Sequence, residues 1–195
     1  MLHPGQRRLM RLVSNGAVGE VSLVRTTRSS MGAGSPHGAP TDFSWFYQGG
    51  AGEMSSMTGY GLIKMTAVLG SVKSLAATSC ISMPERVMRD GPAKGKRVQV
   101  DVLDNNVMVL DFGNNTLGTM DTGYVMMASE APDLELFGTE GVISTYGGDQ
   151  VDRIRLYKDD WNTDVAGWQD VDIPRLDSRW GQAFFHSSEP GRRCA

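Results

Sequence analysis

The sequence has few of the residues from which metal sites and disulfide frameworks are built. It contains two cysteines and three histidines in 195 residues. The cysteines show no C-x-x-C spacing, and the histidines lie far apart in the chain, at His3, His37 and His186. We therefore expect neither a disulfide framework nor a metal site.

Long apolar runs are also missing. A membrane-spanning helix needs about 18 consecutive apolar residues, and the sequence has no such stretch. Its start, Met-Leu-His-Pro-Gly-Gln-Arg-Arg, lacks the apolar run of a signal peptide. The net charge of −3 gives no electrostatic reason for binding to nucleic acid or to an acidic membrane. We expect a cytoplasmic protein with no nucleic-acid partner and no membrane partner.

The sequence lacks the Gly-x-Gly-x-x-Gly turn that holds the pyrophosphate of a dinucleotide. The nearest segment is Gly32-Ala-Gly-Ser-Pro-His-Gly38, which has the wrong final spacing and contains a proline. No helix is expected to follow it, so its amides have no helix N-terminus with which to hold a phosphate. We interpret residues 29–40 as a loop, and we expect no cofactor to be bound by this chain alone.

Composition and periodicity predict an α+β fold. The 195 residues are 40% hydrophobic and 21% charged, which is typical of one soluble globular domain. The apolar spacing predicts helices over residues 3–15 and 53–69. Alternation with a period of two predicts strands at residues 18–27, 72–79, 97–103, 106–112, 116–126, 134–137, 142–146 and 153–157. We predict one domain over residues 1–195, in which a predominantly antiparallel open sheet carries helices on one face and the tail, 159–195, is irregular.

Turn residues between the later strands predict that they form one sheet of hairpins. These turns are Asp104-Asn105, Gly113-Asn114 and Gly138-Thr-Glu-Gly141. Cys80 ends an alternating run, where we expect a buried free thiol. The strands between residues 97 and 109 would leave an apolar sheet face that favours a homo-oligomer, formed by Val98, Val100, Val102, Val107 and Val109. A polar face exposed to water remains the alternative.

Residues 45–70 carry the groups best suited to chemistry. An aromatic run, Trp45 to Tyr47, precedes a glycine-rich loop and then the second predicted helix. Residues four apart lie above one another on a helix, so Ser56, Tyr60 and Lys64 are expected to line one side. The other side is expected to be apolar, with Met54, Met57, Met65 and Val68.

This segment resembles the Gfo/Idh/MocA family of NAD(P)-dependent oxidoreductases, which includes glucose-fructose oxidoreductase and inositol dehydrogenase. In that family a Gly-Gly-Gly loop leads into Asp-x-x-x-His or Asp-x-x-x-Tyr, and the helix closes with Leu-Gly. The matching positions here are Ser56, Tyr60 and Leu69-Gly70. Weaker matches extend the resemblance through most of the chain, at residues 3–4, 15–21, 104–105, 110–113 and 134–143. The resemblance concerns the C-terminal substrate domain, and neither a Rossmann domain nor the family's Glu-Lys-Pro segment is found in the sequence.

The resemblance implies a substrate-binding and oligomerisation domain of a sugar or polyol oxidoreductase. NAD(P) is the implied cofactor, and a separate Rossmann subunit or a longer gene would have to supply its binding domain. Tyr60 would exchange the proton of a substrate hydroxyl, with Ser56 and Lys64 orienting that hydroxyl. The substrate itself would contact Trp45, Tyr47, Gly50 and Gly52.

Other readings of the same residues remain open. Ser56 replaces the family's aspartate and cannot accept a proton as a carboxylate does, so the chain is alternatively a non-catalytic binding or scaffold module. Tyr60 is equally expected as a packed structural tyrosine, and Lys64 is expected to be solvated unless it replaces the missing family lysine. Residues 45–47 suit a hydrophobic plug, and the glycines suit positive φ angles. Tyr60 and Lys64 also match the Tyr-x-x-x-Lys pair of short-chain dehydrogenases, which is the weakest of these hypotheses.

Overall fold

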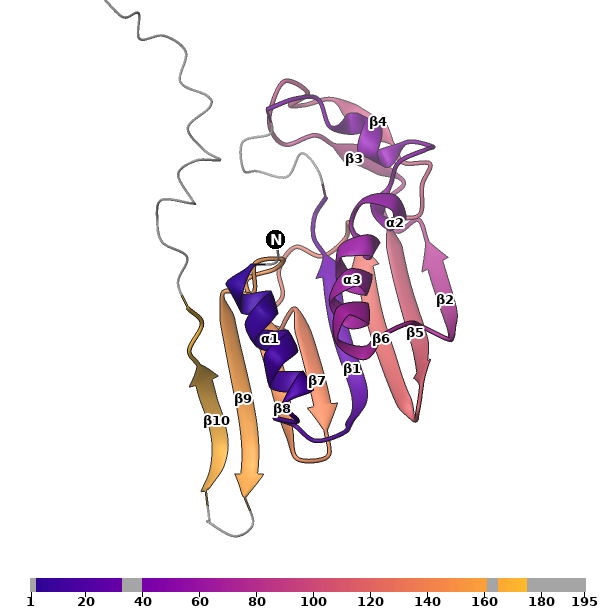
Figure 1. Cartoon of the computed structure of the whole chain (residues 1–195). Helices are drawn as coiled ribbons and strands as arrows, with labels where there is room; N and C mark the ends of the chain where they lie inside the picture. Colours follow the sequence, from indigo (N-terminus) through magenta and orange to yellow (C-terminus); the bar gives the residue numbers. More distant parts are fainter. Residues whose placement is uncertain (1–2, 33–39, 161–164, 175–195) are drawn as a thin grey trace, which may run out of the picture.

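A large mixed sheet covered by helices on one side forms the body of the protein (Figure 1). The computed structural model describes residues 3–32, 40–160 and 165–174. Helices α1 (Pro4–Ser14), α2 (Glu53–Ser56) and α3 (Thr58–Leu69) and the 3-10 helix η1 (Ser44–Tyr47) are its helical elements within those residues. The strands are β1 (Val21–Ser29), β2 (Ser74–Cys80), β3 (Glu85–Val87), β4 (Arg97–Gln99), β5 (Asn105–Gly113), β6 (Thr116–Gly123), β7 (Leu134–Gly138), β8 (Gly141–Tyr146), β9 (Arg153–Asp160) and β10 (Val165–Val171). The predicted α+β class is confirmed.

The large sheet has eight strands in the order β10-β9-β8-β7-β1-β6-β5-β2. Strand β1 is parallel to β6, and every other described pair in this sheet is antiparallel. The predicted predominance of antiparallel pairing is therefore confirmed. Figure 1 shows α1 and α3 on the same side of the sheet, as the sequence predicts.

The main core fills the space between these helices and the sheet. Alternate residues of each strand point to that space, and Val24, Leu110 and Leu136 are completely buried there. Leu9 of α1 and Met65 of α3 pack against them from above. Burial of each such side chain stabilises the fold by roughly 1.5–3 kcal/mol relative to exposure. The apolar side chains that both helices direct toward the sheet thus explain why this sheet face is covered.

The expected helix over residues 53–69 is interrupted, so that prediction was wrong in one respect. Helix α2 ends at Ser56, and Met57 joins it to α3 with φ −112°. The amide of Tyr60 bonds the carbonyl of Met57, three residues back, instead of continuing the α-helical pattern. The interruption turns the apolar stripe, so Met54 is 45% exposed and not part of the core.

Residues 97–103 do not join the large sheet. Strand β4 pairs only with β3 in a separate two-stranded sheet, which Figure 1 shows beyond the end of α3. Val98 and Val100 are buried there in a second core with Tyr47 and Tyr124. The predicted apolar sheet face thus loses these two valines to a core, while Val107 and Val109 remain exposed on β5.

Asp104, expected in a hairpin turn, is instead a fully buried carboxylate. It accepts hydrogen bonds from the amide of Ser82 at 2.6 Å and from the guanidinium of Arg86 at 2.9 Å. A carboxylate buried in this way is stable only when charged and polar partners surround it. Asp104 directly precedes β5 and therefore anchors the segment that carries the small sheet to the start of that strand.

Two further expectations concern the edges of the sheet. Cys80 is free and exposed, because β2 is an edge strand that the helices do not cover, and the expectation of a buried thiol was wrong. Residues 165–171 form β10, so the predicted irregular tail begins with a regular strand. Strand β10 pairs along its whole length with β9. The remainder of that tail, residues 175–195, and most of the expected loop, residues 33–39, lie outside the described residues.

Helix α1 packs directly on the turn between β8 and β9. A Cβ at Gly5 would collide with the carbonyl oxygen of Val151, so a side chain there would push the helix away. The side-chain amide of Gln6 donates to the backbone carbonyl of Asp149 at 2.6 Å. These contacts hold residues 147–151, the turn that reaches the candidate site below.

We expect Gly5→Ala to lower the free energy of unfolding by about 2 kcal/mol, because the added methyl group has no space beside the Val151 carbonyl. Urea denaturation followed by circular dichroism measures this loss. Gly59→Ala is the matched control, since no heavy atom lies within 4 Å of its Cβ position. That control should retain or gain stability, because alanine favours a helix by up to about 1 kcal/mol over glycine. Equal midpoints for the two variants would contradict the close packing of α1.

Candidate functional site

Tyr60 lies on the surface of α3 beside an arginine whose side chain is 10% exposed. The tyrosine is 49% exposed, and its ring lies 5.8 Å from the guanidinium carbon of Arg28. Arg28 follows Val24 and Thr26 in the alternation of β1, which places all three on the helix-covered face. The central strand thus presents a cation to the ring of Tyr60.

Lys64, one turn after Tyr60, is buried, so the expectation of a solvated lysine was wrong. Its side chain is 4% exposed, and its ammonium donates to the carbonyl of Gly148. Burial, followed by the charge of Arg28, lowers the pKa of Lys64. Asp149 lies 3.9 Å from this ammonium and 2.9 Å from the Arg28 guanidinium. The turn between β8 and β9, which packs against α1, therefore contacts both Arg28 and Lys64.

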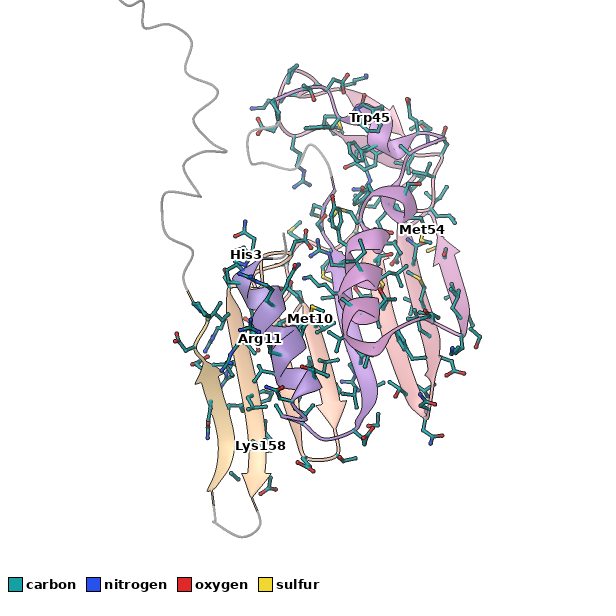
Figure 2. All side chains as sticks on the ribbon, in the orientation of Figure 1. His3, Met10, Arg11, Trp45, Met54 and Lys158 are labelled. Atoms are coloured by element: carbon teal, nitrogen blue, oxygen red, sulfur yellow. The ribbon has the colours of Figure 1, made fainter. Side chains whose placement is uncertain are left out.

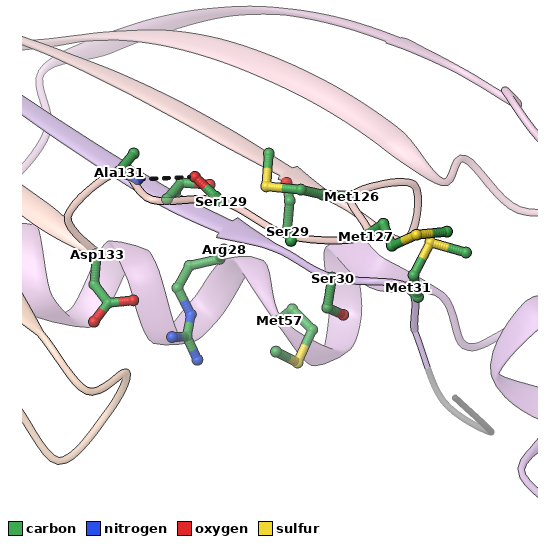
Figure 3. Close-up of a pocket in the computed structure, with 12 residues that line it drawn as sticks. Arg28, Ser29, Ser30, Met31, Met57, Met126, Met127, Ser129, Ala131 and Asp133 are labelled. Carbon is green, nitrogen blue, oxygen red and sulfur yellow. Dashed lines mark hydrogen bonds between the residues drawn. The ribbon is translucent and has the colours of Figure 1, made fainter. Parts of the chain in front are cut away.

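A pocket of about 430 Å³ opens beside this cluster (Figure 3). The end of β1, residues 27–31, forms one wall, Met57 another, and the segment between β6 and β7, residues 126–133, a third. Figure 3 shows Arg28 between Asp133 and Met57. Asp133 accepts the amide of Gly148 at 2.6 Å, which ties the pocket to the same turn. The volume is within the range of small-molecule sites, roughly 300–1,000 Å³.

Ser56 does not share this environment. Its hydroxyl is 2.5 Å from the hydroxyl of Tyr124 and donates to the carbonyl of Gly52 at 2.8 Å. Burial raises the pKa of Tyr124. Because α2 ends at Ser56, the expected alignment of Ser56 with Tyr60 on one helix side does not occur.

The proposed substrate-binding residues lie around the second core. Tyr47 is 2% exposed, with its ring against Tyr124 and under the guanidinium of Arg86, as the plug interpretation predicts. Trp45 is exposed at the small-sheet end of the molecule, where Figure 2 labels it. Gly50 and Gly52 have φ angles of 92° and 97°. None of the four residues lines the pocket beside Arg28.

A buried carboxylate fixes the junction of α2 and α3. Glu53 is completely buried and accepts hydrogen bonds from Thr122 at 2.6 Å, Asn106 at 2.9 Å and Thr58 at 3.1 Å. Burial raises the pKa of Glu53 despite these donors. Since Thr58 begins α3 and the other two residues lie on β5 and β6, Glu53 sets where α3 starts on the sheet. The position of Tyr60 follows from this contact.

Sequence reasoning missed Arg28, Glu53, Asp133 and Asp149. For Arg28 a signal exists, because it continues the Val24–Thr26 alternation and so belongs to the covered face of a buried strand. Glu53 directly follows a glycine-rich loop at a helix start, where a carboxylate is usually solvated. For Asp133 and Asp149 the sequence gives no such signal, because both lie in connections between strands.

The sequence matches the model of the GFO/IDH/MocA C-terminal domain over residues 6–144. The chain belongs to this family. The match includes β1, α2 and α3 and therefore Arg28, Met57 and Tyr60 of the site. The family resemblance inferred from the sequence is confirmed.

Solved structures share the fold. An NAD-binding oxidoreductase from Klebsiella pneumoniae superimposes with a TM-score of 0.68 at 18% identity, covering 87% of this chain and 44% of that one. Levoglucosan dehydrogenase in complex with NADH and levoglucosan gives 0.65 at 21% identity, with coverages of 87% and 47%. An oxidoreductase domain protein from Kribbella flavida gives 0.64 at 19% identity, with coverages of 86% and 44%. The chain thus spans about half the length of these proteins. A comparison with curated proteins finds no match.

Two further properties of the described residues bear on function. No helix among them is long and apolar enough to cross a membrane. In the same part of the chain, no three His, Cys, Asp or Glu side chains gather as the ligands of a metal ion would.

We expect the burial of Lys64 to make stability depend on pH. The unfolded chain keeps the Lys64 proton up to the ordinary pKa of 10.5, whereas the folded chain releases it at lower pH. The unfolded state binds more protons between these two values, so the free energy of unfolding rises with pH across that window. Urea denaturation of wild type and Lys64→Met between about pH 8 and 10.5 measures the difference, which should grow in favour of wild type by about 1.4 kcal/mol per unit of pKa lowering.

Lys94→Met removes one charge at an exposed lysine and serves as the control. A constant difference between wild type and Lys64→Met over this pH range would show that the ammonium is not buried in solution.

Proposed function

We propose that the chain is the substrate-binding and oligomerisation domain of an NAD(P)-dependent sugar or polyol oxidoreductase. The observation that carries this proposal is the position of Tyr60, which is exposed on α3 beside Arg28, a residue that lines the pocket together with Met57. Family membership and the sugar complexes of levoglucosan dehydrogenase support the substrate class.

Tyr60 is suited to exchange the proton of a substrate hydroxyl. Its phenol both donates and accepts hydrogen bonds, and its half-exposed position leaves it accessible to a ligand. The guanidinium of Arg28 lies beside the tyrosine ring, where a cation–π contact helps to hold the ring in place. Lys64 acts indirectly. Its ammonium donates to the carbonyl of Gly148 and so positions the turn that carries Asp149. We therefore assign the proton transfer to Tyr60 and a positioning role to Lys64.

The described residues do not form a cradle for the dinucleotide. Helix α2 follows the short helix η1 and its loop, and α3 continues from α2, so neither of them leaves a strand through a glycine-rich phosphate turn. The cofactor accordingly requires a nucleotide-binding domain from the same polypeptide or from a separate subunit. The chain spans about half of the matched oxidoreductases, which is consistent with a second domain of similar size.

The exposed side of α3 is suited to contact that domain. Its exposed residues are Gly59, Tyr60, Ile63 and Ala67, and Lys64, the one charged residue of the helix, points inward. A surface helix normally carries charged residues toward water. Small and apolar residues instead allow close approach of another protein surface, so we assign this side to the nucleotide-binding domain.

The opposite side of the large sheet is suited to bind a second copy. Directly paired residues form an apolar row across six strands: Trp168, Tyr157, Val142, Phe137, Leu23 and Leu117. Leu117 is 50% exposed, and Val107 and Val109 extend the apolar surface on β5. Guanidinium groups of Arg25 and Arg155 lie over Phe137 and Trp168 and shield part of the row. The remaining apolar surface favours self-association over a fully solvated face.

A non-catalytic binding or scaffold module is the second candidate. The observation that favours it is Ser56, whose hydroxyl bonds Tyr124 in the position where the resembled family has an acidic residue. Such a module would keep the pocket, the α3 surface and the sheet while lacking turnover. The two candidate functions predict different effects of a substitution at Tyr60.

We expect Tyr60→Phe to change the free energy of unfolding by less than about 1 kcal/mol, because a half-exposed hydroxyl loses little when it is removed. The same change should weaken sugar binding, measured by calorimetry, and abolish turnover when a nucleotide-binding domain is supplied. Tyr124→Phe is the matched control, since its buried hydroxyl bonds Ser56. It should lower stability by about 1–2 kcal/mol without removing binding. Unchanged turnover in Tyr60→Phe would refute the proton-transfer role, and absence of turnover in wild type would favour the scaffold module.

We expect the chain to form a dimer or larger oligomer through the open sheet face, detected by light scattering at high micromolar concentration. Leu117→Lys should produce monomers of nearly unchanged stability, because it places a charge at a half-exposed position in the apolar row. Ile63→Lys introduces the same charge on α3 and should leave the oligomer intact. A monomeric wild type, or equal dissociation by both changes, would exclude the sheet face as the interface.

A further inference from the structure

Four methionines form the apolar part of the pocket beside Arg28, next to its serine, threonine and charged residues. Met31 comes from the chain after β1, Met57 from the α2–α3 junction, and Met126 and Met127 from the segment after β6 (Figure 3). Thioether side chains donate no hydrogen bonds and adapt their shape to apolar groups. A site for a fully hydroxylated sugar would instead be expected to present donors and acceptors on these walls.

The polar groups of the pocket are mostly engaged by the protein itself. Ser29 donates to Asp121 at 2.9 Å, and Asp133 accepts the amide of Gly148 at 2.6 Å. Ser30 and Ser129 accept backbone amides, at 3.0 and 3.1 Å, and each can still donate its hydroxyl proton. The pocket thus offers hydrogen bonds to a few ligand hydroxyls but not to a complete set.

The charges around the pocket cancel. The cations Arg28 and Lys64 face the carboxylates Asp133 and Asp149, and Arg28 is paired with Asp149 at 2.9 Å. A carboxylate or phosphate on a ligand would compete with Asp149 for Arg28 and would meet the nearby negative charge of Asp133. The pocket therefore favours an uncharged ligand.

We infer that the substrate of this site is an uncharged sugar or polyol that carries an apolar substituent, such as a deoxy methyl group or an O-methyl group. The inference rests on the proposed function and narrows its substrate class. The substituent packs against the methionine side chains of the lining, Met57 or Met126 among them, while the hydroxyls bond Ser30, Ser129 and Asp133. Arg28 stays paired with Asp149.

Methyl NMR of the chain with ¹³C-labelled methionine tests this inference. The 12 methionines report on ligand contact, and those outside the pocket serve as internal references. The probes are D-galactose, its 6-deoxy form D-fucose and D-galacturonate, which differ only at C6, together with D-glucose and methyl β-D-glucopyranoside. We expect the apolar member of at least one pair to bind about tenfold more tightly than its parent and to shift the signals of Met57 and Met126, as one buried methyl or methylene group commonly achieves.

Substitution of the pocket methionines provides the second arm. Met57→Gln and Met126→Gln keep the side-chain length and should remove the preference for the apolar member over its parent sugar. Met10→Gln, on α1 outside the pocket, is the matched control and should keep the preference.

The outcomes separate this inference from the proposed function. Parent sugars that shift the pocket signals and bind as tightly as their apolar partners would overturn the inference and leave the proposed function in place, as would tightest binding by D-galacturonate. Absence of binding by every sugar, or shifts confined to methionines outside the pocket, would overturn both.

Discussion

The buried ammonium of Lys64 is the contact on which the candidate site depends. It belongs to α3, yet its hydrogen-bond acceptor is the carbonyl of Gly148, 84 residues away in the turn between β8 and β9. The same turn supplies Asp149 to Arg28 of β1 and is packed against α1 at Gly5. A buried charge is tolerated only with such partners, so the two helices, the central strand and the turn must assemble together. Tyr60 and the pocket occupy the surface of that assembly.

Glu53 imposes a second constraint at the other end of α3. Its carboxylate is satisfied by hydroxyl and amide groups of Thr58, Asn106 and Thr122, and these contacts require α2 to end before α3 begins. An unbroken helix would carry Thr58 past the carboxylate and would bring Ser56 into line with Tyr60. The interruption at Met57 therefore separates two environments. Ser56 joins the core of the small sheet, whereas Met57 lines the pocket and Tyr60 lies on the exposed side of α3.

Local patterns predicted the elements of this fold well, and long-range polar contacts explain where they failed. The period of two identified every strand of the large sheet except β10, which lies in the segment expected to be irregular, and the exposure of Tyr60 agrees with the polar side assigned to its helix. The break at Met57 depends on partners of Glu53 that lie 53 and 69 residues away, which no local pattern contains. The small sheet likewise depends on the buried Asp104–Arg86 pair, and the exposure of Cys80 depends on the strand order.

The charged groups of the site and the shape of its pocket have different roles. The two cations and two carboxylates of the site hold α3, β1 and the β8–β9 turn in place, since Lys64 bonds Gly148 and Arg28 pairs with Asp149. In the proposed function, little net charge is then left to select a ligand, and Tyr60, to which we assign the proton transfer, remains accessible. Selection must instead come from the shape of the methionine-lined walls and from the surface that approaches the uncharged side of α3. In the proposed function, substrate choice is thus decided where the two domains meet, because Met57 and Tyr60 stand on the same stretch of helix that the second domain would cover.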